Sequence, residues 1–143
     1  WEPVAPTVHR PHASELVTST ATPSHLHHPH PRGRDGWRLA VEHRIAPALN
    51  AFQPDLLFLS MGFDGALGDI GNTNEHGKPG LDLTPADYEW ATRLLVHGTL
   101  RGRVPVVSVL EGGYGAFSPD ADQDGFDRSS LVRCVCAHVE GLA

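Results

Sequence analysis

Two glycine-flanked turns carry the residues of this sequence that are best suited to chemistry. SMGFDG presents Asp64 directly after an apolar run, and LEGGYG presents Tyr114 after another. A carboxylate in a protein-lined position is costly unless a donor or a cation receives it, and a divalent metal ion would do so. A neutral tyrosine hydroxyl can donate a hydrogen bond to an oxygen on which negative charge develops. The first turn is therefore a candidate for metal binding and the second for oxyanion stabilisation.

Each of these residues also has a structural interpretation. Asp64 could cap its own turn or pair with a nearby donor, and Tyr114 could be an aromatic lid over the core. Gly112 and Gly113 free the backbone to place the tyrosine hydroxyl and would let a substrate approach closely, so we predict that they bind substrate. Asp69 could cap a turn, accept a hydrogen bond behind the site or be solvated, and we favour a structural role.

Two apolar segments position these turns. PDLLFLS at residues 54–60 and VPVVSVL at residues 104–110 have the continuous apolar character of strands buried on both faces. Between them, a helix is predicted with Thr84 as N-cap, Pro85 at its first position and Asp87 in its first turn. This order is that of a βαβ unit with parallel strands, whose carboxyl ends form sites. Both turns are therefore expected at one edge of one sheet.

The rest of the chain divides into a loop segment and further helices. Residues 1–36 hold half of the twelve prolines and six of the ten histidines, so we predict an exposed loop there whose histidines, including those at 25–30, play no part in catalysis. Residues 37–143 then form the folded portion. The apolar spacing predicts a helix over 37–52 that is kinked or split at Pro47, and residues 61–83 read as a loop. A last helix begins near residue 127 and is expected to bury Leu131, Val135, Val139 and Leu142.

Length and composition limit the classes of function. The 143 residues suffice for one domain, and a net charge of −6 argues against a general nucleic-acid-binding surface. Apolar runs stay well short of about 20 residues, so we expect no transmembrane helix. Cys134 and Cys136 are two positions apart on a predicted helix and would point away from each other, which fits a reducing compartment. Because the chain begins at Trp1, we expect it to be part of a longer product.

Three segments together resemble a known family. FQPDLLFLSMGFDGALGD, GLDLTPADYEWATRLL and VVSVLEGGYG are similar, in order and spacing, to the C-terminal half of the catalytic domain of zinc-dependent histone deacetylases, most of all the class II type. The resemblance runs from about Gly36 to the C-terminus. It implies an α/β, arginase/deacetylase-like three-layer fold with a parallel sheet, of which this chain is the C-terminal portion. It also implies that Asp64 is a ligand of Zn²⁺ and that Tyr114 polarises the acetyl carbonyl and stabilises the tetrahedral intermediate.

The same resemblance implies amide hydrolysis of acetyl-lysine in a protein substrate such as a histone tail. We also expect an intracellular protein, nuclear or cytoplasmic, with no direct nucleic-acid or membrane partner. The family draws two more zinc ligands from an Asp-x-His motif and a general base from a His-His pair, and these 143 residues contain neither in the family's context. We therefore expect deacetylation from the complete domain and none from these residues alone. The alternative is a non-catalytic deacetylase-like interaction module; a ureohydrolase fits less well, because no Asp-x-Asp follows either strand.

Overall fold

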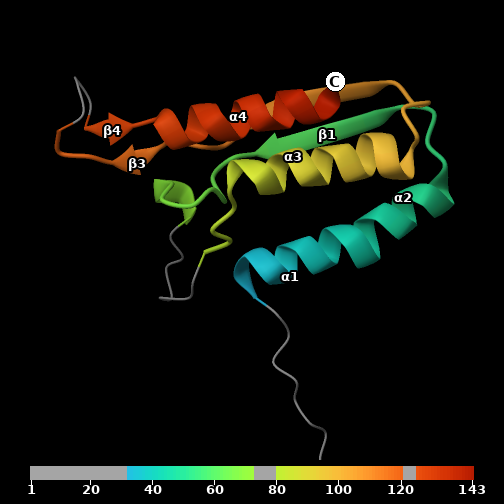
Figure 1. Cartoon of the computed structure of the whole chain (residues 1–143), viewed down its shortest axis with the longest axis horizontal. Helices are drawn as coiled ribbons and strands as arrows, with labels where there is room; N and C mark the ends of the chain where they lie inside the picture. The colour runs from blue at the N-terminus through green and yellow to red at the C-terminus, as the bar shows by residue number, and fades with distance from the viewer. Residues whose placement is uncertain (1–31, 73–79, 121–124) are drawn as a thin grey trace, which may run out of the picture.

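The computed structural model describes residues 32–72, 80–120 and 125–143, so the histidine-rich stretch at 25–30 lies outside the described residues. The main elements are α1 (Gly33–Ala40), α2 (Ala46–Phe52), β1 (Leu57–Gly62), α3 (Pro85–Arg93), β2 (Val106–Glu111), β3 (Ala116–Phe117), β4 (Phe126–Asp127) and α4 (Ser129–Leu142). In Figure 1, α3 lies between the α1–α2 helix and α4, with the paired strands beside them. Across these residues, no helix combines the length and apolar character that crossing a membrane requires.

The predicted βαβ unit is confirmed. β1 and β2 pair in parallel from Leu57 opposite Val106 to Gly62 opposite Glu111, and α3 lies between them in the chain. Both strands begin and end later than predicted. The start of β2 at Val106 has a physical reason, because Pro105 lacks the N–H that a ladder position needs. Its carbonyl instead accepts a hydrogen bond from the amide of Leu57 at 2.9 Å. The described residues thus form a mixed α/β arrangement with a small parallel sheet.

The prediction that both strands are buried on both faces is wrong for the described residues. Leu59 is buried, whereas Phe58 is 64% exposed and Val107 and Val109 are also exposed. Successive side chains of a strand point to opposite faces of the sheet. Among the residues that the structure describes, helices cover only the face that carries Leu59, where it packs into a core with Ala91 and Leu95.

The first helix is longer than predicted and is interrupted differently. It begins at Gly33, so residues 33–36 are helical although a loop was predicted, and the division of the chain at residue 36 stays a prediction. The interruption expected at Pro47 takes the form of a π-helical turn over Val41–Ile45, after which α2 begins with Pro47 in its first turn. A proline at that place costs little, because the missing N–H coincides with the change in helical pattern.

The face that the last helix presents to the core agrees only in part with the prediction: Leu131, Val135 and Leu142 are partly buried and pack against the core, but Val139 does not. The buried residues of α4 are Cys134, Ala137, His138 and Gly141, while Val139 is 52% exposed. The small side chains let α4 lie close against α3: a Cβ at Gly141 would come within 2.9 Å of the Thr92 Cβ. Cys134 is buried and Cys136 exposed, and both are free thiols, as their spacing predicted.

His138 is buried in a hydrogen-bonded chain that joins three elements. The Thr92 hydroxyl donates to the carbonyl of Tyr88 at 2.8 Å, so it accepts from His138 Nδ1 at 2.7 Å. His138 Nε2 is then left to accept from the Ser108 hydroxyl at 2.7 Å. Burial lowers the pKa of His138, which keeps the ring neutral. These hydrogen bonds fix α3, α4 and β2 relative to one another.

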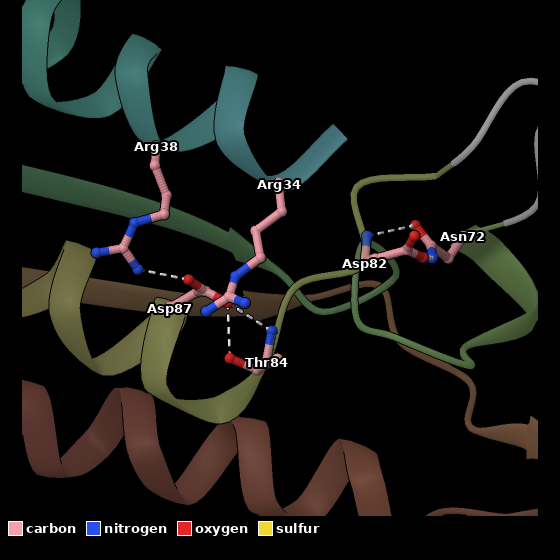
Figure 2. Close-up of polar contacts among 6 residues, drawn as sticks. All are labelled: Arg34, Arg38, Asn72, Asp82, Thr84 and Asp87. Atoms are coloured by element: carbon pink, nitrogen blue, oxygen red, sulfur yellow. Dashed lines mark hydrogen bonds and ion pairs between the residues drawn. The ribbon is translucent and has the colours of Figure 1, made fainter. Parts of the chain in front are cut away.

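Asp87 connects the start of α3 to α1, as Figure 2 shows. Its carboxylate accepts hydrogen bonds from the amide and hydroxyl of Thr84 at 2.8 and 2.7 Å, which confirms the predicted cap. It also pairs with Arg34 at 2.7 Å and Arg38 at 2.6 Å. Burial alone would raise the pKa of Asp87, but the hydrogen bonds from Thr84, Arg38 and Arg34 outweigh burial and lower it from 3.8 to about 2.

Asp87→Asn is therefore expected to destabilise the fold by about 2 kcal/mol at neutral pH, the free energy that corresponds to the lowered pKa. Because the pKa is lower in the folded state, this stabilisation is present above pH 3.8 and is lost as the pH falls through about 2. Urea unfolding across this pH range measures it. The exposed pair of Glu89 with Arg93 supplies the control, and Glu89→Gln should cost less than about 0.5 kcal/mol. Equal stability of wild type and Asp87→Asn at pH 7 would contradict the prediction.

Candidate active site at the carboxyl edge of the sheet

The two predicted turns lie at the same end of the parallel strands. The Asp64 turn (residues 62–65) follows β1, and the Tyr114 turn (residues 112–115) follows β2. The amide of Phe63 donates to the carbonyl of Gly112 at 3.1 Å, which continues the ladder beyond the strands and joins the turns. The topology therefore brings both sequence motifs to one edge.

Asp64 is exposed and lies against the Tyr114 turn. A Cβ added at Gly112 would be 3.0 Å from Asp64 Oδ1, so the carboxylate lies directly over that glycine. Within residues 32–72, 80–120 and 125–143, no hydrogen bond or ion pair is made by this carboxylate. The alternative that Asp64 caps its own turn thus gains no support, and none of these described residues occupies its oxygens.

Tyr114 is 53% exposed and is not buried in the core. It lines a pocket of about 340 Å³ together with the two preceding glycines and residues of β2, α4 and the Asp64 turn: Phe63, Leu110, Glu111, Gly112, Gly113, Leu131 and Val135. Asp64 is not among the lining residues. That Asp64 and the Tyr114 hydroxyl face one cleft therefore stays a prediction.

Gly113 is a position where only glycine fits. Its φ is +112°, and a Cβ there would lie 2.7 Å from Leu131 Cδ1 and 2.8 Å from Phe63 Cβ. Both distances are shorter than real Cβ contacts. Close packing of the turn against α4 and the Asp64 turn is thus sufficient reason for glycine here, and substrate binding by Gly112 and Gly113 stays a prediction.

Asp69 is buried and accepts hydrogen bonds at both carboxylate oxygens. Its side chain receives hydrogen bonds from the backbone amides of Gly71 at 2.8 Å, Tyr114 at 2.7 Å and Gly115 at 2.8 Å. With 5% of its surface exposed, it is not solvated, which removes one of the three alternatives considered for it. The loop predicted over 61–83 is correspondingly ordered here, with a 3₁₀ turn at Ile70–Asn72.

The support beneath the site is aromatic and uncharged. The ring of Phe63 lies tilted against that of Tyr88, with 5.0 Å between the ring centroids, and Tyr88 is 1% exposed. Burial raises the pKa of Tyr88, and the nearby carboxylates of Asp64 and Asp69 raise it further. The Tyr88 hydroxyl consequently stays protonated, and it has no hydrogen-bond partner among the described residues. Helical periodicity can indicate that such a tyrosine faces the core, but no sequence pattern places its hydroxyl.

The donor set fits one ligand of a metal site. Asp64 has carboxylate oxygens that no described residue pairs with, as a zinc ligand needs, whereas a catalytic zinc site uses three protein ligands. Over the described part of the chain, no group of three histidine, cysteine, aspartate or glutamate side chains could hold a metal ion. A three-ligand site that includes Asp64 would therefore need at least one ligand from outside the described residues.

This geometry defines a class of protein: an α/β protein that carries an acidic turn and a tyrosine turn at the carboxyl edge of a parallel sheet. A sequence model of the histone deacetylase domain matches residues 11–122, which is well over half of the chain. The chain belongs to the histone deacetylase domain family, as the three motifs predicted. The match begins inside the segment 1–36.

Its relatives include type-2 enzymes. The chain is 37% identical over 102 residues to "Type-2 histone deacetylase 2" of Dictyostelium discoideum and 38% identical over 89 residues to "Histone deacetylase 15" of Arabidopsis thaliana. It is 40% identical over 70 residues to "Histone deacetylase HDA1" of Candida albicans. These alignments cover 69%, 62% and 49% of this chain, but only 5%, 14% and 7% of the relatives' lengths.

Proposed function

We propose that this chain contributes the Asp64 turn and the Tyr114 turn to a zinc-dependent protein lysine deacetylase that hydrolyses the amide of acetyl-lysine. The observation that carries the proposal is the meeting of the two turns at one sheet edge, within a chain of the deacetylase family. We infer that the complete domain has the arginase/deacetylase-like three-layer fold. Its substrate would be an acetylated protein such as a histone tail, in the nucleus or the cytoplasm.

In this mechanism Tyr114 acts on the acyl carbonyl. Its hydroxyl would donate a hydrogen bond to the carbonyl oxygen, on which charge builds as the amide carbon becomes tetrahedral. The half-exposed ring beside a pocket of about 340 Å³ supports this role, because the hydroxyl need not leave a packed core to reach a substrate. Gly112 and Gly113 would let the substrate approach the backbone of the turn.

Asp64 would be one ligand of Zn²⁺. When bound, zinc supplies a Lewis acid and lowers the pKa of a coordinated water molecule toward about 7. The exposed carboxylate, without a hydrogen bond or ion pair to the described residues, supports this assignment. The remaining ligands and the general base would be provided by the rest of the complete domain.

The test uses the complete polypeptide that contains these residues. It is expected to release acetate from an acetyl-lysine peptide, to lose this activity to a zinc chelator and to regain it with added Zn²⁺. The 143 residues alone should show neither stoichiometric zinc nor deacetylation, because one carboxylate does not complete a site. If the complete polypeptide binds no zinc and hydrolyses no acetyl-lysine peptide, the chain is instead a non-catalytic, deacetylase-like interaction module.

A further inference from the structure

We propose that Asp69 is a positioning residue that holds the Tyr114 turn and so sets where the tyrosine hydroxyl lies. This inference deepens the proposed function, since it rests on Tyr114 acting on the acyl carbonyl. Asp69 itself would contact neither substrate nor metal. It would act through the backbone of the turn.

The carboxylate of Asp69 contacts two segments of the site, the Tyr114 turn and Gly71. Asp69 Oδ2 accepts from the consecutive amides of Tyr114 and Gly115 at 2.7 and 2.8 Å, and Oδ1 accepts from Gly71 at 2.8 Å. The amide of Ile70 donates in return to the carbonyl of Gly115 at 3.0 Å. The tyrosine's own backbone N–H is therefore among the groups that Asp69 holds.

Burial strengthens these bonds. Asp69 is 5% exposed, so its charge is compensated chiefly by the three amides, and hydrogen bonds to an ionised acceptor are roughly twice as strong as neutral ones. The turn needs such support, because Gly113 and Gly115 have φ of +112° and +90° and lie between the end of β2 and the short strand β3. Glycines in this region otherwise leave the backbone mobile.

Gly71 links Asp69 to the aromatic ring of Tyr114. A Cβ at Gly71 would lie 2.8 Å from Asp64 Cβ, 3.1 Å from Asp69 Oδ1 and 3.2 Å from Tyr114 Cε2. The Tyr114 ring consequently rests against the backbone of residue 71, whose amide Asp69 also holds. One carboxylate thus fixes both the turn that carries the ring and the surface on which the ring lies.

The test is Asp69→Asn in the complete polypeptide. Asparagine keeps the shape of the side chain, but it turns one acceptor into an N–H group that must face a backbone N–H. We expect kcat to fall by about 10- to 100-fold with KM changed less than about threefold and zinc content unchanged, as for a displaced catalytic group. The matched control is Asp55→Asn: Asp55 is exposed and, within the described residues, makes no hydrogen bond or ion pair, so activity should stay unchanged.

A double-mutant cycle separates positioning from a general structural role. In a Tyr114→Phe background, Asp69→Asn should lower kcat by less than about threefold, because the hydroxyl that Asp69 positions is already absent. A full additional 10- to 100-fold loss in that background would overturn the proposal.

Hydrogen exchange gives a readout that does not depend on activity. In the wild type the amides of Tyr114 and Gly115 should be protected although the tyrosine side chain is half-exposed, and in Asp69→Asn they should exchange at least about tenfold faster. Rapid exchange of both amides in the wild type would overturn the proposal even if the variant does not fold. If the wild type has no deacetylase activity, the proposed function fails, while the exchange rates still decide whether Asp69 holds the turn.

Discussion

Asp64→Ala is expected to remove zinc from the complete polypeptide and to lower deacetylation by more than about 100-fold. Loss of groups that merely orient a metal ligand costs about 10- to 100-fold, so loss of a ligand should cost more. The structure predicts little direct effect on folding, because Asp64 is exposed and no hydrogen bond or ion pair joins it to the described residues. Metal analysis and steady-state kinetics with an acetyl-lysine peptide measure both effects.

Comparison of metal-free proteins separates ligand loss from unfolding. Without zinc, wild type and Asp64→Ala should have free energies of unfolding within about 0.5 kcal/mol of each other, as is usual for exposed substitutions. With zinc, only the wild type should gain stability, since binding to the native state alone stabilises it. Stoichiometric zinc in Asp64→Ala with unchanged affinity would show that the Asp64 turn is not a metal-binding turn.

The sequence predicted those parts of the fold that depend on local signals. The cap at Thr84 and Pro85 marks the start of α3 unambiguously, and the apolar runs on either side of it predicted parallel strands. Because parallel strands end at one edge, the positions of Asp64 and Tyr114 relative to the sheet followed from topology alone. Those positions depend on the order of the strands and not on any side-chain contact.

Predictions that depended on tertiary partners were less successful. In α4, periodicity favoured Val139 for the core, but the helix buries Ala137 and Gly141 against α3 and satisfies His138 with Thr92 and Ser108. A polar side chain such as that of His138 can be buried only if hydrogen-bond partners lie beside it. Its partners are 46 and 30 positions away in the chain, so the helix sequence alone does not reveal them.

Asp69 illustrates the same limit within the candidate site. Its spacing from Asp64 left a cap, a supporting acceptor and a solvated side chain open, with a structural role favoured. The choice depended on the amides of Tyr114 and Gly115, which lie 45 and 46 positions further along the chain and reach Asp69 only because β1 and β2 pair in register. A sequence pattern does not show that a carboxylate will accept hydrogen bonds from backbone amides so far along the chain.

Tyr114→Phe should affect chemistry without affecting metal binding. The substitution keeps the ring and its contact with Gly71, and it leaves the glycines of the turn unchanged. Removing one preorganised donor to a developing oxyanion typically costs about 100- to 1000-fold in kcat, or about 3 to 4 kcal/mol. Since the hydroxyl acts mainly in the transition state, KM should change little and zinc content should remain that of the wild type.

The buried tyrosine of α3 provides the matched control for Tyr114. Tyr88→Phe removes a hydroxyl that has no hydrogen-bond partner among the described residues, so turnover should stay within about threefold of the wild type and stability should not fall. Both variants lose the same atom, one from a half-exposed ring at the sheet edge and the other from a ring that is 1% exposed. If Tyr114→Phe keeps near-full turnover, Tyr114 is an aromatic lid and the proposed mechanism is wrong. If both variants lose activity equally, the loss reflects packing around Phe63 rather than a hydrogen bond to the substrate.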